Sequence, residues 1–240
     1  MLKDSQLDLC GRVDFARTTP LLARDEAFSF ACAGCGGCCR GREDIVLSGF
    51  DLWRIAGRLR LPPQTVARAF CRASIGQVSH LPVLRLAPVK ENRNNCPFLT
   101  EDHCAIHDAE PLVCALYPLA QEISREGEVS YFLQPTACGG RVIEAKVEDY
   151  LSRYDVPARE QTDVRWALGC MELEDVVEQA ETLLSPVLVR RMQAKLWQAL
   201  YFNYDYTQRF LPQLERNLNW LNGEIVKLTE YQKIQNGKSK

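Results

Sequence analysis

The stretch ACAGCGGCCR, residues 31–40, decides how the rest of the chain is interpreted. It spaces four cysteines as C-x2-C-x2-C-C, with glycines between them: Cys32, Cys35, Cys38 and Cys39. Short C-x2-C steps let a loop wrap around one metal ion, so that thiolates converge on it. Glycines let the backbone curl tightly and leave N–H groups free to point at sulfur, which stabilises thiolate charge. The pattern therefore predicts a metal centre held by cysteine.

Four later cysteines can complete such a centre: Cys96, Cys104, Cys114 and Cys138. With the first cluster they make eight thiols, enough for two sites of four sulfurs each. Cysteines at C-x2-C spacing with a remote fourth, one of them followed by proline, are typical of bacterial iron–sulfur ligation. Zinc ribbons prefer two separated C-x2-C pairs, and no second pair follows residue 39. The spacing favours an iron–sulfur cluster as the cofactor and leaves zinc open.

The adjacency of Cys38 and Cys39 constrains the geometry. Neighbouring side chains diverge around a Cα step of about 3.8 Å, whereas one small ion requires convergence. Either the two cysteines bind different metals, or only one of them is a ligand. We favour the first arrangement because more cysteines follow along the chain.

Composition limits the classes of function. The chain has 240 residues, of which 46% are hydrophobic and 25% are charged, as in ordinary globular proteins. The net charge is −2, so the chain has no overall positive electrostatic potential to attract nucleic acid. Proteins that bind nucleic acid usually carry clustered positive charge. No stretch approaches the roughly 18 consecutive apolar residues of a membrane helix. We therefore expect metal ions as ligands, and neither nucleic acid nor a membrane as a partner.

The N-terminal sequence and the cysteines together predict where in the cell the protein is found. The first eight residues carry charges where a signal peptide needs its apolar core, so we expect a cytoplasmic location. Disulfides are rare in a reducing cytosol, and clustered cysteines there indicate metal or redox chemistry. The total of eleven cysteines is odd, which fits poorly with a fully paired disulfide framework.

Cysteine density predicts three regions in an α+β chain that is predominantly α. A lead-in over 1–30 precedes a loop-rich, cysteine-cluster metal-binding module over 31–140, and a helical region over 141–240 packs on that module. In the module, Ser48 and Asp51 resemble a capping box that opens a helix. The expected elements there are helices over 48–59 and 63–72, strands over 83–89 and 129–133, and a turn over 91–95.

The helical region carries apolar stripes at helical spacing. One stripe runs from Leu173 to Leu184, and Pro186 ends that helix. Another helix is expected over 187–202. A last helix begins near Pro212, and its apolar positions are spaced 4, 3, 4, 3: Leu214, Leu218, Leu221, Ile225 and Leu228. Core packing is the ordinary role of such stripes, and a face for a protein partner is the alternative.

These residues resemble a known family, the YkgJ-type cysteine-cluster proteins, described as a zinc- or iron-chelating domain. Its hallmark is C-x2-C-x2-C-C, then a C-P-F-L-like segment, a C-x-I-(Tyr or His)-x-x-R-P-x-x-C-x-x-Y-P-like segment and a late cysteine near glycine. The eight cysteines fall on those positions, and so do His107, Pro111, Tyr117 and Pro118. The resemblance covers about residues 31–140 and implies metal binding through the thiols.

One departure from the family pattern is Glu110, where the family usually has arginine. It puts any role of that arginine in doubt and leaves the thiols untouched. Flagellin lysine N-methylase carries a similar cysteine cluster, which supplies an enzymatic alternative. The resemblance therefore implies metal binding but does not define a reaction.

Two other interpretations of the motif cysteines fit the sequence less well. Ordinary buried thiols would not require such dense cysteine and glycine, and a thioredoxin-like pair would require a preceding βαβ strand. The three cysteines outside the motif are expected to be buried apolar residues: Cys10, Cys71 and Cys170. His103 and His107 are expected to donate or accept hydrogen bonds rather than bind metal. The aromatic residues over 201–206 are expected to pack at a helix end.

The hypothesis from sequence is a metal-binding protein in which the eight cysteines hold an iron–sulfur cluster or zinc in a structural or redox role. Two alternatives stay open. One is a protein-modifying enzyme related to flagellin lysine N-methylase. The other is an interaction module in which zinc staples the loops and the C-terminal helices dock a protein partner.

Overall fold

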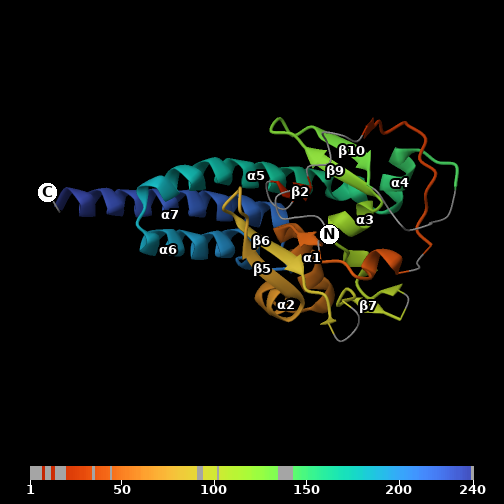
Figure 1. The fold of residues 1–240 in the computed structure, drawn as a ribbon, viewed down its shortest axis with the longest axis horizontal. Coiled ribbons are helices and arrows are strands. Elements are labelled where there is room, and N and C mark those ends of the chain that lie inside the picture. Colours follow the sequence, from red (N-terminus) through yellow and green to blue (C-terminus); the bar gives the residue numbers. More distant parts are fainter. Residues whose placement is uncertain are drawn as a thin grey trace.

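The computed structural model describes residues 7–8, 12–13, 20–33, 36–43, 45–90, 94–101, 103–134 and 143–238. Small antiparallel sheets occupy the N-terminal half, and long helices occupy the C-terminal half (Figure 1). The predicted class, α+β with helix predominating, is confirmed. None of the described helices is long and apolar enough to cross a bilayer.

Three long helices extend away from the sheets and form the elongated end of the molecule (Figure 1). They are α5 (Val156–Leu183), α6 (Pro186–Trp197), which runs into the π-helical turn η6 (Gln198–Phe202), and α7 (Phe210–Lys238). Pro186 begins α6, where a missing N–H costs nothing. The α7 positions from Leu214 to Ile225 are buried as the 4, 3, 4 spacing predicts.

A helical hairpin and a three-stranded sheet pack beside these helices. Helix α1 (Gly49–Leu59) opens with the predicted capping box, and α2 (Pro63–Phe70) follows it. The sheet has the order β4-β6-β5, with every pair antiparallel. Its strands are β4 (Val46–Leu47), β5 (Cys71–Ile75) and β6 (Pro82–Leu86). The expected helix to residue 72 is too long, because Cys71 already pairs with Leu86 in the β5–β6 hairpin.

A second set of small elements lies at the opposite end from the C-terminus (Figure 1). A sheet of order β3-β10-β9 joins β3 (Leu21–Leu22), β10 (Val129–Leu133) and β9 (Leu119–Ile123), and α4 (Val147–Arg153) lies near it. Strand β10 matches the prediction, whereas β9 was not expected. The remaining elements are short: β1 (Leu7–Asp8), β2 (Arg12–Val13), η3 (Gly37–Cys39), β7 (Leu99–Thr100), β8 (His103–Cys104), η5 (His107–Ala109) and α3 (Leu112–Leu116). In the expected turn over 91–95, residues 91–93 lie outside the described residues.

The described buried side chains fall into two clusters. The large cluster unites α1, α2 and the β4-β6-β5 sheet with the long helices, with Leu52, Leu84, Leu173 and Leu221 among its members. The small cluster joins Phe28, α3, β9, β10 and α4. The large cluster is thus continuous across residue 140, and the division of the chain at that residue stays a prediction.

Candidate metal centre

A pocket of about 400 Å³ collects cysteines from three separate segments of the chain. Six of the eight motif cysteines line it: Cys32, Cys38, Cys39, Cys96, Cys104 and Cys114. The other two, Cys35 and Cys138, lie outside the described residues. The sequence predicts that the later cysteines complete the centre begun by the early ones, and the fold brings the described six to one cavity.

Backbone hydrogen bonds fix the first cysteine segment against the second. Gly36 has a φ of 64°, which places it in the left-handed region that favours glycine, and it begins the short η3 turn. The N–H of Cys39 donates to the carbonyl of Gly36 at 3.0 Å. The N–H of Cys96 donates to the carbonyl of Cys39 at 2.8 Å, so two distant cysteines face the same pocket.

The second segment is a small hairpin that carries Cys96 and Cys104. Cys104 pairs with Leu99 across β7 and β8. Burial raises the pKa of the Cys96 thiol, although hydrogen bonds from the N–H groups of Phe98 and Leu99 to its sulfur act in the opposite direction. Burial likewise raises the pKa of Cys104 to about 11 against a hydrogen bond from the Ile106 N–H. Such N–H donors stabilise a thiolate once a cation replaces the proton.

The third segment is helix α3, which carries Cys114. Its pKa lies well above the ordinary value because the thiol is buried and because Glu110 and other thiols add negative charge nearby. A thiol of this kind stays protonated by itself, and a metal cation must displace the proton when it binds.

Cys38 and Cys39 behave differently from each other. Their Sγ atoms lie 3.9 Å apart. The hydrogen bond between the two thiols lowers the pKa of Cys38 to about 6, and the same contact, together with burial, raises the pKa of Cys39. The contact between the two thiols thus shifts their pKa values in opposite directions.

Polar side chains complete the pocket wall. The Glu110 side chain is only 14% exposed, and its Oε2 lies 3.1 Å from Nδ1 of His107. Burial raises the pKa of Glu110. His103 also lines the pocket, and its Nε2 lies 3.1 Å from Oγ1 of Thr100. Both histidines thus make the kind of polar contact that was expected of them.

Within the described part of the chain, no three Cys, His, Asp or Glu side chains converge closely enough to hold one metal ion. The thiols therefore line a shared cavity, but the described ones are not arranged as the tetrahedral ligand set of a single ion. The donor set itself is soft, and thiolates select zinc and iron–sulfur clusters among the biological metals. The residues present therefore fit either group in chemical type.

The described cysteines outside the motif lie elsewhere. Cys170 is 2% exposed within the large cluster, as expected. Cys71 is half-buried on β5, and burial raises its pKa to about 12. Cys10 lies outside the described residues. Among the aromatic residues over 201–206, which were expected to pack at a helix end, Tyr201 and Tyr204 are buried where η6 ends.

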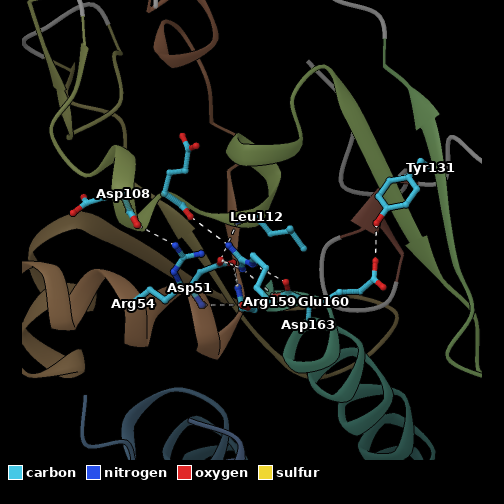
Figure 2. Close-up of polar contacts among 10 residues, drawn as sticks. Asp51, Arg54, Asp108, Leu112, Tyr131, Arg159, Glu160 and Asp163 are labelled. Atoms are coloured by element: carbon cyan, nitrogen blue, oxygen red, sulfur yellow. Dashed lines mark hydrogen bonds and ion pairs between the residues drawn. The ribbon is translucent and has the colours of Figure 1, made fainter. Parts of the chain in front are cut away.

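Sequence reasoning missed a buried ion network next to the pocket. Arg159 on α5 binds Asp51 of α1 and Asp163 of its own helix (Figure 2). The i,i+4 spacing of Arg159 and Asp163 was a signal for that pair. Asp51 was recognised only as a helix cap, and nothing in the sequence linked it to residue 159.

Comparison with known proteins agrees with this location. Residues 31–139 match the model of the CxxCxxCC family, described as "Putative zinc- or iron-chelating domain". The match covers the predicted module and confirms the resemblance found from the motif. No curated protein and no solved structure matches the chain.

Proposed function

We propose that this chain is a metal-binding protein whose cysteine pocket holds an iron–sulfur cluster, with zinc as the alternative metal. The proposed ligands are the eight motif cysteines: Cys32, Cys35, Cys38, Cys39, Cys96, Cys104, Cys114 and Cys138. The observation that carries the proposal is the common pocket lined by six of them, although they come from segments far apart in sequence.

The surroundings of the sulfurs support the iron–sulfur choice. The N–H groups that point at the sulfurs of Cys96 and Cys104 are the kind of contact that adjusts the potential of such a cluster. Apolar side chains shield the space beside the thiols: Phe30, Leu86, Phe98 and Ile106. An iron–sulfur cluster there would supply one-electron transfer, whereas zinc would only hold the loops together.

The proposal includes two centres rather than one. Eight thiols are available and a cluster needs four. The divergence of neighbouring side chains around the short Cα step supports the assignment of Cys38 and Cys39 to different centres. A cytoplasmic location belongs to the same proposal, because the thiols must stay reduced to bind metal.

The test is metal and acid-labile sulfide analysis, with an absorption spectrum, on the full chain purified without oxygen. We expect iron with matching sulfide and broad visible absorption. Colourless protein with stoichiometric zinc would overturn the iron–sulfur assignment and keep the metal site. Protein with neither metal, which also fails to take up Zn²⁺ or to be reconstituted with iron and sulfide, would overturn the proposed function.

A second candidate is a zinc-stapled interaction module. Exposed apolar side chains at the α5–α6 turn and along the last turns of α7 favour it: Leu183 (54% exposed), Val187 (52%) and Ile234 (56%). Zinc without iron in the analysis above would favour this candidate, since a staple requires no redox chemistry.

A further inference from the structure

We propose that Asp51 and Arg159, which lie outside the cysteine pocket, are positioning residues that fix helix α3 and so place the thiol of Cys114. The inference rests on the proposed function for its metal readout. Neither residue lines the pocket. Figure 2 shows them where α1, α5 and the loop before α3 meet.

The Asp51 carboxylate joins two helix beginnings. Its Oδ2 accepts a hydrogen bond from the N–H of Ser48 at 3.0 Å, which completes the cap of α1. Its Oδ1 accepts one from the N–H of Leu112 at 3.0 Å. Leu112 is the first residue of α3, and Cys114 follows two residues later. A single side chain, 2% exposed, thus connects α1 to the helix that carries a pocket thiol.

Arg159 holds that carboxylate in place. Its Nη2 donates to Asp51 Oδ1 at 2.6 Å, and its Nε donates to Asp163 Oδ2 at 2.6 Å. Its Nη1 reaches the carbonyl of Glu110 at 3.4 Å, and its guanidinium lies over the Phe50 ring. Burial alone would lower the pKa of Arg159, but the two carboxylates outweigh it and the net pKa is raised. Arg159 is therefore a permanent cation.

Helix α3 is short, so a partner outside the helix contributes much to its stability. It spans only Leu112–Leu116 and has no side-chain cap of its own. Isolated helices of that length are unstable, and the first N–H groups of any helix lack partners within the helix. A carboxylate at a helix N-terminus supplies such a partner and favourable charge. With the Glu110 carbonyl also held, both residues that flank Pro111 are pinned to the network.

The alternative is that the network only holds α1 against α5. The chain offers a matched pair that separates the two roles. Asp51→Asn and Asp163→Asn each neutralise a buried carboxylate bound to the same Arg159, and Asp51 is the one that accepts a hydrogen bond from the Leu112 N–H of α3. Both variants leave the pocket lining unchanged. A purely structural role predicts equal effects at α3, and a positioning role predicts unequal ones.

Two readouts are taken on the full chain. The first is hydrogen exchange of the Val113–Leu116 amides in the metal-free protein. The second is Zn²⁺ affinity, measured by competition with a chromophoric chelator. For Asp51→Asn we expect at least about tenfold faster exchange at α3 and roughly 10- to 100-fold weaker Zn²⁺ binding, the usual range for residues that orient a ligand. For Asp163→Asn we expect a smaller change in both.

A second pair keeps the test decisive if Asp51→Asn does not fold. Leu112→Pro deletes the N–H that Asp51 accepts, and proline suits the first helical position. Pro111 has extended backbone (φ −56°, ψ 151°), which a following proline favours. Leu112→Ala removes the same side chain and keeps the N–H. We expect the proline variant to exchange faster at α3 and bind Zn²⁺ more weakly than the alanine variant.

Equal α3 exchange within each pair would overturn the positioning role, whatever the Zn²⁺ result. Unequal exchange with equal Zn²⁺ affinity within each pair would overturn the link from α3 to the thiol of Cys114. Failure of the wild-type chain to bind Zn²⁺ or iron would instead count against the proposed function. The exchange readout would still test the Asp51–Leu112 contact in that case, so the two failures are distinguishable.

Discussion

The two buried clusters of this molecule differ in what holds them together. Among the described residues, thirty buried side chains form the large cluster around the long helices, and the pocket residues Cys96, Cys104 and Cys114 pack against its edge. Nine buried side chains form the small cluster around α3, α4, β9 and β10. The large cluster has long helices and a continuous apolar interior, and the burial of that interior stabilises the fold without any metal. The small cluster depends on short elements connected by loops. We therefore expect the small cluster and the cysteine loops to depend on metal for their folding more than the long helices do.

Metal removal should give the largest effect and would test that comparison. Structural zinc contributes on the order of 10 kcal/mol to small metal-dependent domains. We expect a chelated, metal-free chain to be cut by protease first in the cysteine loops and around the small cluster. Residues of the large cluster, from α1 to β6 and from α5 to α7, should resist longer. Mass spectrometry of the fragments measures this, and simultaneous cleavage throughout the chain would contradict it.

A pair of core substitutions sharpens the comparison. Leu221 and Leu151 are both fully buried, the first in the large cluster and the second in the small one. Each change to alanine should cost about 2–5 kcal/mol of unfolding free energy by leaving a cavity. We expect Leu221→Ala to keep the metal content of the wild type and Leu151→Ala to lower it. Denaturant titration with metal analysis checks both, and equal metal content would argue against separate roles.

Alanine substitutions of the adjacent Cys38 and Cys39 should change the amount of bound metal and little else. If Cys38 and Cys39 serve two centres, Cys38→Ala and Cys39→Ala should lose different fractions or types of metal. If one is only the hydrogen-bonding partner of the other, one variant should keep all its metal. Identical loss to the same residual content would indicate a single shared polynuclear site and reduce the count to one.

Removal of the Glu224 charge in the helical region should have the smallest effect, a pH-dependent change in melting temperature. Hydrogen bonds from Lys195 and then Lys227 lower the pKa of Glu224 from 4.5 to about 2. A lowered folded-state pKa means that this carboxylate adds stability above pH 4.5 and loses it as pH falls towards 2. The difference in melting temperature between the wild type and Glu224→Gln should be constant above about pH 5 and shrink below it. A difference that grows at low pH would contradict the sign.

Much of the helical region was predictable because its pattern is local. The seam at Leu214, Leu218, Leu221 and Ile225 is buried as its spacing indicates, and Pro186 marks a helix boundary. The Ser48–Asp51 capping box was also found, since it depends on two residues three apart. Periodicity and capping act within a few turns, so the sequence reports them directly.

Contacts between distant segments were harder to predict. Strand β9 was missed, and residues 71–72 at the start of β5 were assigned to the preceding helix, because each strand is stabilised by its hairpin partner rather than by its own composition. In the candidate site, the motif named the thiols, but the Asp51–Leu112 and Asp51–Arg159 bonds join residues 61 and 108 positions apart. Such bonds follow from the packing of α1, α3 and α5, which no local pattern encodes.

The central claim is that the pocket thiols hold the metal, and one comparison of two variants tests it most directly. Cys114→Ala removes a thiol that lines the pocket, and Cys71→Ala removes a half-buried thiol that does not. Metal per chain is measured on both proteins after purification without oxygen, beside the wild type. We predict that Cys71→Ala keeps the full metal content and Cys114→Ala loses at least one centre. Full metal in both variants, or equal loss in both, would contradict the account.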